Sequence, residues 1–190
     1  MADLSLPAFS PLHPRSRSLA WQLAALLLGT ALLTASSWIR VPMLPVPMTM
    51  QTFAVTLIGA LYGWRLGAAT VMAWLLQGAT GLPVFAGGAG GAMHLVGATG
   101  GYLIAFPIAA ALTGWLAERG WNGRRPALAL VSMLAGNALC LLIGTAWLAT
   151  FVGLEKAIAV GALPFLLGAA VKSALAAATL RALPRGARAA

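Results

Sequence analysis

The side chains best suited to chemistry in this sequence are polar ones that interrupt long apolar runs. Lys172 stands within one such run, and Gln51, Gln77 and Asn137 stand within others. A lysine at the centre of a membrane span costs about 2.5 to 3.5 kcal/mol, so it usually faces a cavity or a partner. No carboxylate occupies any of these runs, and we therefore expect an anionic ligand to bring the negative charge. The alternative is a neutral or carbonyl-bonded Lys172 with a structural role.

The sequence has few residues that could act in catalysis or bind a metal ion. The only carboxylates are Asp3, Glu118 and Glu155, and all three lie in predicted termini or connections. An intramembrane metal site or proton path needs carboxylates or paired histidines. His94 and several serines leave a serine–histidine dyad open, but a structural or gating histidine fits a loop position better. We predict no catalytic residue, no metal ligand and no cofactor.

Composition identifies the elements that position these side chains. The chain has 190 residues, of which 61% are hydrophobic and 8% are charged, and a soluble domain of this length could not bury so much apolar surface. We predict an all-α integral membrane protein whose membrane domain, residues 19–183, lies between cytoplasmic tails at 1–18 and 184–190. The predicted spans are six: Leu19–Ile39, Met48–Trp64, Leu66–Gly81, Ala98–Ala117, Ala127–Phe151 and Val160–Leu183.

The distribution of Lys and Arg predicts the orientation. Nine of the 12 basic residues fall on one side, against two on the other and Lys172 within a span. Cytoplasmic connections collect positive charge, so both termini should be cytoplasmic in a multi-pass protein of the cell (inner) membrane. The basic residues do not form the stripe with exposed aromatic residues that nucleic-acid binding requires, so the expected surroundings are membrane lipid. The nine are Arg15, Arg17, Arg65, Arg119, Arg124, Arg125, Arg181, Arg185 and Arg188, and the two are Arg40 and Lys156.

Two uncharged connections then share the outer side. Val41–Thr49 (VPMLPVPMT) is rich in proline, and Leu82–Gly97 (LPVFAGGAGGAMHLVG) is rich in glycine. Irregular backbone at membrane depth is tolerated where it is buried in protein or lines a wet cavity, so these loops predict a pocket or its lid. An interfacial loop that only closes the fold is the alternative.

Several polar side chains in the spans have two interpretations. Gln51, Gln77 and Asn137 suit either interhelical hydrogen bonds or a binding pocket. Trp74 and Trp147 suit either the membrane interface or stacking on a ligand.

Four ordered segments resemble the signature segments of a known family. VPMLPVPMTMQT (Val41–Thr52), GATGLPVFAGGAGG (Gly78–Gly91), GATGGYLIAFP (Gly97–Pro107) and LPFLLGAAVK (Leu163–Lys172) resemble those of the BioY family, the biotin-binding S components of energy-coupling factor (ECF) vitamin transporters. The resemblance covers nearly the whole chain. It implies a six-helix fold with an outward-facing biotin pocket under the first and third connections. The pocket residues that it implies are Gln51, Phe85, Thr99, Tyr102, Asn137 and Lys172.

The resemblance also implies partners. S components dock on a transmembrane coupling protein that two ATPase subunits drive, and Ala31 and Ala35 resemble the Ala-x-x-x-Ala docking surface. Packing inside the protein is the alternative for this pair. Two positions depart from the family pattern: Ala169 replaces an aspartate three residues before Lys172, and Ala98 replaces a proline. The first change leaves open whether Gln51 or Asn137 hydrogen-bonds the ureido ring of biotin.

The sequence therefore predicts a biotin-capture subunit without covalent chemistry of its own. The competing hypothesis is a structural or assembly membrane protein that has no small-molecule ligand.

Overall fold

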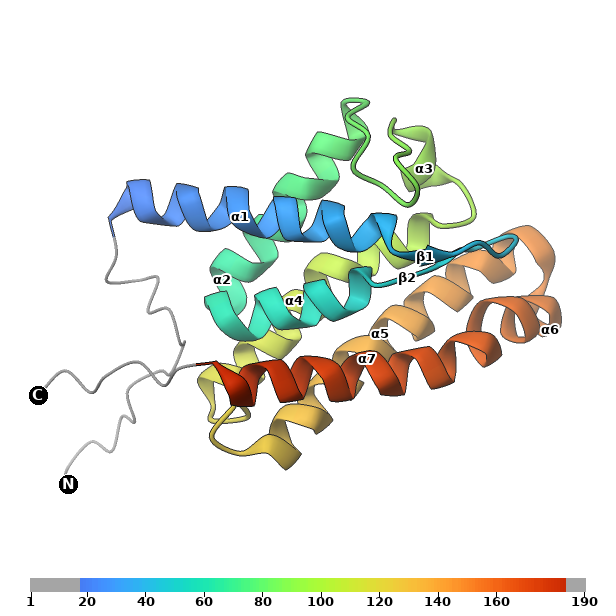
Figure 1. Cartoon of the computed structure of the whole chain (residues 1–190). Coiled ribbons are helices and arrows are strands. Elements are labelled where there is room, and N and C mark those ends of the chain that lie inside the picture. Colours follow the sequence, from blue (N-terminus) through green and yellow to red (C-terminus); the bar gives the residue numbers. More distant parts are fainter. Residues whose placement is uncertain (1–17, 184–190) are drawn as a thin grey trace, which may run out of the picture.

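A computed structural model describes residues 18–183 of the chain. The predicted cytoplasmic tails, with Arg15, Arg17, Arg185 and Arg188, lie outside the described residues except for Ser18. Long helices dominate, as predicted, and a two-stranded ribbon joins the first two (Figure 1). The elements are α1 (Leu19–Trp38), β1 (Arg40–Val41), β2 (Met48–Thr49), α2 (Gln51–Ala79), α3 (Met93–Val96), α4 (Gly100–Glu118), α5 (Pro126–Val152), α6 (Leu154–Ala157), the π-helix η2 (Ile158–Ala162) and α7 (Leu163–Ala182).

Within residues 18–183, five helices are long and apolar enough to cross a membrane, counting α6, η2 and α7 as one. The expected boundary between the second and third spans is a sharp bend inside α2. Gly63 adopts φ +78°, a left-handed conformation that glycine accepts without strain. The Glu118 carboxylate accepts a hydrogen bond from the Trp64 backbone N–H at 3.4 Å, which ties the bend to the end of α4. The six predicted segments are thus present, and the second and third are two helical arms that meet at the non-helical Gly63 (Figure 1).

The last span begins earlier than predicted. The charges of Glu155 and Lys156 indicated a connection, but both residues lie in α6, the first turn of the final helical segment. Gly153, at φ +83°, ends α5 and starts α6, so the turn between the two helices needs a single residue. An acidic residue in a first helical turn complements the positive end of the helix dipole.

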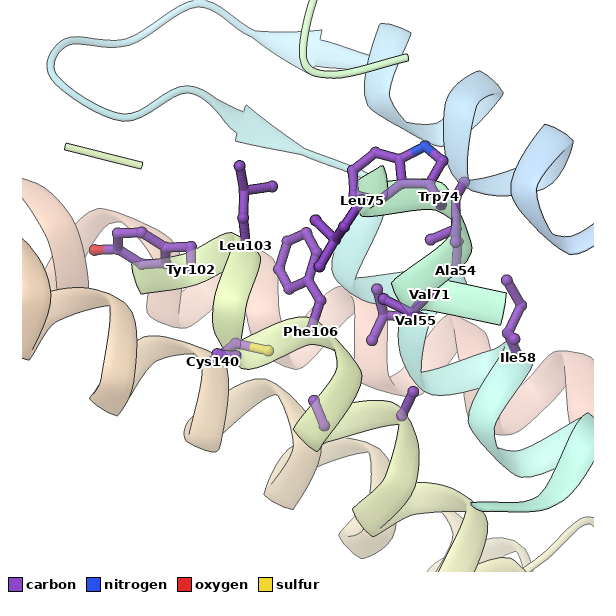
Figure 2. Close-up of a cluster of buried hydrophobic side chains, with 14 of the residues drawn as sticks. Ala54, Val55, Ile58, Val71, Trp74, Leu75, Tyr102, Leu103, Phe106 and Cys140 are labelled. Atoms are coloured by element: carbon purple, nitrogen blue, oxygen red, sulfur yellow. The ribbon is translucent and has the colours of Figure 1, made fainter. Parts of the chain in front are cut away.

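Small residues let the central helices approach closely. α2 makes its most extensive packing with α4. A Cβ atom at Gly59 would collide with the Ala110 carbonyl oxygen, and one at Gly114 would lie 2.5 Å from the Trp64 backbone nitrogen. Figure 2 shows the core that results, with Val55 and Trp74 from the two arms of α2 near Phe106 of α4.

The bundle has two different ends. α1 begins and α7 ends at one of them, where the α2 bend and the α4–α5 connection also lie (Figure 1). β1, β2, α3 and α6 lie at the other end, with the glycine-rich connection. The short β1–β2 ribbon departs from the all-helical prediction, because the proline-rich loop reverses and pairs Arg40 with Thr49 and Val41 with Met48.

The two loops at this second end contact each other and α1. The Ser37 hydroxyl, at the end of α1, donates to the Val84 carbonyl oxygen at 2.8 Å. A Cβ at Gly87 would collide with the Arg40 guanidinium, so the glycine-rich loop lies directly against β1. The predicted grouping of the two loops on one face is therefore present in the structure.

Candidate binding cavity

A cavity of about 270 Å³ lies beneath the two loops. This volume is close to the lower end of the range for small-molecule sites. Four helices, α2, α4, α5 and α7, form its walls, and both loops contribute side chains. The lining residues are Pro45, Val46, Pro47, Thr49, Gln51, Thr52, Phe85, Ala86, Ala89, His94, Thr99, Tyr102, Leu103, Phe106, Asn137, Cys140, Leu141, Phe165, Ala169 and Lys172.

All six residues that the sequence predicted for a pocket line this one cavity. They come from four helices and the glycine-rich loop, and they span more than a hundred positions in the chain. The structure brings together Gln51, Phe85, Thr99, Tyr102, Asn137 and Lys172.

Lys172 is buried, with 7% of its surface exposed, and its Nζ donates to the Thr49 carbonyl oxygen at 3.1 Å. An ammonium group has three N–H donors, so this bond leaves two for other acceptors. None of the lining residues within 18–183 is a carboxylate, and Ala169 lies on the same wall as Lys172.

Gln51 begins α2 and is held by the last residue of β2. Its side-chain Oε1 accepts a hydrogen bond from the Thr49 hydroxyl at 2.8 Å. Its Nε2 is buried and has no hydrogen-bond partner within residues 18–183. The same is true of the hydroxyl oxygen of the neighbouring Thr52. Because buried polar groups almost always have partners, these two atoms favour a ligand in the cavity.

Asn137 is buried in α5 and its side-chain nitrogen is already used. Nδ2 donates to the Met133 carbonyl oxygen at 3.1 Å and to the Ser173 hydroxyl at 3.0 Å. The interhelical hydrogen bond that the sequence left as one interpretation is therefore present, between α5 and α7. The side chain also lines the cavity, and its Oδ1 is the polar atom that remains.

Tyr102 and Phe165 give the cavity an aromatic wall. The Tyr102 hydroxyl donates to the Gly161 carbonyl oxygen at 2.8 Å, inside η2. A π-helix leaves carbonyl groups without their usual α-helical partners, so this bond satisfies one of them. The ring stacks on Phe165 with centroids 6.3 Å apart.

Phe85 closes the cavity from the glycine-rich loop. Its ring packs edge-on against Trp74 at 5.2 Å and against His94 at 5.9 Å. A Cβ at Gly78 would collide with this ring, so the end of α2 needs a glycine there. Thr99 anchors the loop's other end, because its hydroxyl donates to the His94 carbonyl oxygen at 3.3 Å.

The positions of Trp74 and Trp147 do not support stacking on a ligand in this cavity. Trp74 is fully buried in the core, where it packs against two lining residues, Phe85 and Phe106. Trp147 donates from Nε1 to the Gly97 carbonyl oxygen at 2.9 Å, so it fastens the loop to α5. Neither residue lines the cavity.

Sequence reasoning missed several lining residues. Phe165, Ala169 and Lys172 follow a spacing of four and three, which places them on one face of a helix and could have identified Phe165. Cys140 carries a similar signal, three residues after Asn137. Pro45, Val46 and Pro47 lie in the proline-rich loop that the sequence predicted for a pocket or its lid, but a loop has no periodic pattern that singles out its lining residues.

Ala31 and Ala35 lie away from the cavity. Both are exposed on α1, beside exposed Leu28 and Leu32. Packing inside the protein was the alternative for this pair, and no part of residues 18–183 buries either alanine. Their exposure leaves the face open to another helix.

The chain is similar in sequence to proteins that are named as biotin transporters. The chain is 41% identical over 157 residues to a probable biotin transporter BioY of Pyrococcus horikoshii, covering 83% of this chain and 92% of that one. It is 40% identical over 137 residues to a biotin transporter BioY of Thermotoga maritima, covering 72% and 79%.

A crystal structure of the S-component for biotin from an ECF-type ABC transporter has the same fold. It superposes with a TM-score of 0.75 at 25% identity, over 87% of this chain and 93% of that chain. The sequence pattern of the BioY family matches residues 10–189. The chain therefore belongs to the BioY family.

Proposed function

We propose that this protein captures biotin from the outer side of the membrane and mediates its uptake. The observation that carries the proposal is the buried Lys172 in a cavity that has no carboxylate among its lining residues within 18–183. Biotin is an apolar ring and chain that ends in a carboxylate, so it supplies the missing charge. The names of the relatives, which are transporters of biotin, support the same ligand.

The remaining lining residues suit the rest of the molecule. Phe85, Tyr102 and Phe165 offer apolar surface to the thiophane ring and the valeryl chain. The ureido group has one carbonyl acceptor and two N–H donors, and Asn137 has an uncommitted carbonyl oxygen to receive a donor. Asn137 thus takes the role that the family assigns to the aspartate replaced by Ala169.

The proposed orientation places the loops outside and both termini in the cytoplasm. Arg65, Arg119, Arg124, Arg125 and Arg181 lie at the end of the bundle where α1 begins and α7 ends. Arg40 and Lys156 are the basic residues of the opposite end within the described chain. The excess of positive charge supports a cytoplasmic position for the first end.

The proposed partners are an ECF transmembrane coupling protein and two ATPase subunits. The description of the structural neighbour as part of an ECF-type transporter supports this assignment. On this chain, we assign docking to the exposed Ala31 and Ala35 of α1, because small residues let a partner helix approach its backbone.

Equilibrium binding of biotin to the purified protein in detergent tests the function. A ligand that binds only the folded state must also raise the temperature of unfolding. A structural protein without a small-molecule ligand, the competing hypothesis, would show neither effect.

Replacing Lys172 tests the observation that carries the proposal. Lys172→Met keeps most of the side-chain length and removes the charge, so we expect the Kd for biotin to rise by about 10- to 100-fold, as for loss of a hydrogen bond to a charged group. Biotinamide, in which a primary amide replaces the carboxylate, should lose much less affinity. A folded variant that binds both compounds as the parent does would show that Lys172 does not pair with the ligand.

A further inference from the structure

The Thr49 hydroxyl is hydrogen-bonded in a way that fixes the direction of the neighbouring amide. It accepts from the Gln51 backbone N–H at 3.3 Å and donates its single hydrogen to Gln51 Oε1 at 2.8 Å. A carboxamide carries its acceptor and its donors on opposite sides. With Oε1 held by Thr49, Nε2 is turned away from Thr49.

The remaining donor, Nε2 of Gln51, is buried and makes no hydrogen bond within the described residues. Gln51 is 5% exposed, and its Nε2 has no hydrogen-bond partner. Rotating the side-chain amide of Gln51 by half a turn would place Nε2 next to the Thr49 hydroxyl and would place Oε1 where Nε2 now lies. The flipped amide is disfavoured because the hydroxyl hydrogen, which Oε1 accepts at 2.8 Å, would then lose its acceptor.

The same threonine also holds Lys172. The carbonyl oxygen of Thr49 accepts from Lys172 Nζ at 3.1 Å, so one residue is bonded to both potential ligand donors. Thr49 itself lines the cavity together with Gln51 and Lys172. The side chains bonded to Thr49 therefore carry N–H donors, and none of the lining residues within 18–183 is acidic.

We propose that Thr49 is a positioning residue that makes this wall specific for a carboxylate. It turns the donor side of Gln51 toward the ligand beside Lys172, so that Nζ binds one carboxylate oxygen and Nε2 binds the other. The identity of the ligand rests on the proposed function. A primary amide fits this wall poorly, because its NH₂ group would face Nε2, donor against donor.

Thr49→Val removes the hydroxyl and keeps the shape of the side chain. The backbone carbonyl that holds Lys172 is unchanged, but the Gln51 amide is free to turn. We expect biotin to lose about tenfold in affinity, as for a hydrogen bond to a charged group, while biotinamide keeps or gains affinity. The ratio of the two Kd values should therefore change by about tenfold or more in favour of biotinamide.

Two matched variants isolate the hydroxyl of Thr49. Thr49→Ser retains it and should retain the ratio of the parent protein. Thr56→Val makes the same substitution one turn beyond Thr52, where the hydroxyl bonds only to the Thr52 and Phe53 carbonyl oxygens, and it should leave the ratio unchanged. Calorimetric titration of each full-length variant with biotin and biotinamide gives the Kd values.

The outcomes separate this inference from the proposed function. If the parent protein does not bind biotin, the proposed function and the inference both fail. If the parent binds biotin but Thr49→Val weakens both ligands equally, the function stands and Thr49 has only a structural role.

A third ligand tests which end of biotin meets Gln51. In 2-iminobiotin the ureido oxygen is replaced and the carboxylate is intact. If Thr49→Val changes the ratio of biotin to 2-iminobiotin but not that of biotin to biotinamide, Gln51 faces the ureido ring, and its assignment to the carboxylate is overturned.

Discussion

The two ends of the bundle use glycine mainly in different ways, although Gly63 and Gly120 at the bend end also adopt positive φ. At the end with the α2 bend, Gly59, Gly67 and Gly114 bring helix backbones into contact, because a Cβ at any of them would strike another backbone. At the end with the loops, Gly87, Gly88 and Gly91 adopt positive φ and let the chain fold over the cavity. The comparison teaches that the cavity depends on both ends, since tight packing at one end fixes helices that stand apart at the other.

Polar groups differ between the ends as well. Near the bend, the buried hydroxyls of Thr113 and Tyr62 both donate to backbone carbonyl oxygens, so their hydrogens are used inside the protein. Near the loops, Lys172, Gln51 and Asn137 reach across to other elements or keep unused atoms. One end is built for packing and the other for a ligand.

Disturbing the packed end should have the largest effect. Gly59→Val places a branched side chain against Ala110 and Thr113, and we expect a loss of about 3 kcal/mol or more in unfolding free energy. Thermal unfolding in detergent measures this, and Ala69→Val, at an exposed site of the same helix, is the control. Equal stability of the two variants would contradict the role of close packing.

Disturbing the loop end should weaken binding without unfolding the protein. Gly87→Val combines a strained φ of +72° with a clash against Arg40, so the lid should shift. We expect the Kd for biotin to rise about tenfold with the unfolding temperature nearly unchanged. Ala92→Val, at an exposed site of the same loop, should bind normally. Global unfolding of the Gly87 variant would show that the two ends are not separable.

The outer face of α1 should matter to neither end. Ala31→Trp and Ala35→Trp add bulk on an exposed surface, so biotin binding should change by less than about twofold. Association with a coupling protein should be lost, because the partner helix can no longer approach. Co-purification with an ECF module measures this, and Leu19→Trp, exposed at the start of the same helix, is the control. Loss of biotin binding together with association would place these alanines in the protein's own packing.

Labelling tests which side of the membrane each end faces, with almost no effect on function expected. In a Cys140→Ala background, Met93→Cys at a 77% exposed position should react with an impermeant thiol reagent in intact cells. His94→Cys, which lines the cavity, should react and be protected by biotin. Arg119→Cys, at the opposite end, should react only after the cells are opened. The reverse pattern would invert the proposed orientation.

Much of the fold could be predicted from the sequence, because long apolar runs and the positions of Lys and Arg obey strong physical rules. The bend at Gly63 was predicted as a connection between two spans, since Gly63 and Arg65 interrupt the apolar pattern, and the structure has non-helical backbone at Gly63. The start of the last helix was misplaced because charged residues occur in first helical turns as well as in loops.

Some residues of the cavity could be predicted from the sequence pattern, and others could not. Polar residues within apolar runs, such as Lys172 and Asn137, stand out in any reading of the sequence. The roles of Phe85 and Thr99 came from the resemblance to a family, since aromatic and threonine side chains in a loop have no distinctive pattern. Thr49 was missed because its importance lies in hydrogen bonds to two residues, one of them far along the chain.

The bend in α2 has a consequence for the surrounding lipid. Its arms, residues 51–62 and 64–79, rise only about 18 Å and 24 Å at 1.5 Å per residue, against a hydrocarbon thickness of about 30 Å. The loops above these arms therefore lie partly within the depth of the membrane, so we expect the exposed Leu44 to contact acyl chains. Bilayer thickness thus sets how far the lid is submerged, so a thicker membrane should make the entrance of a polar vitamin slower.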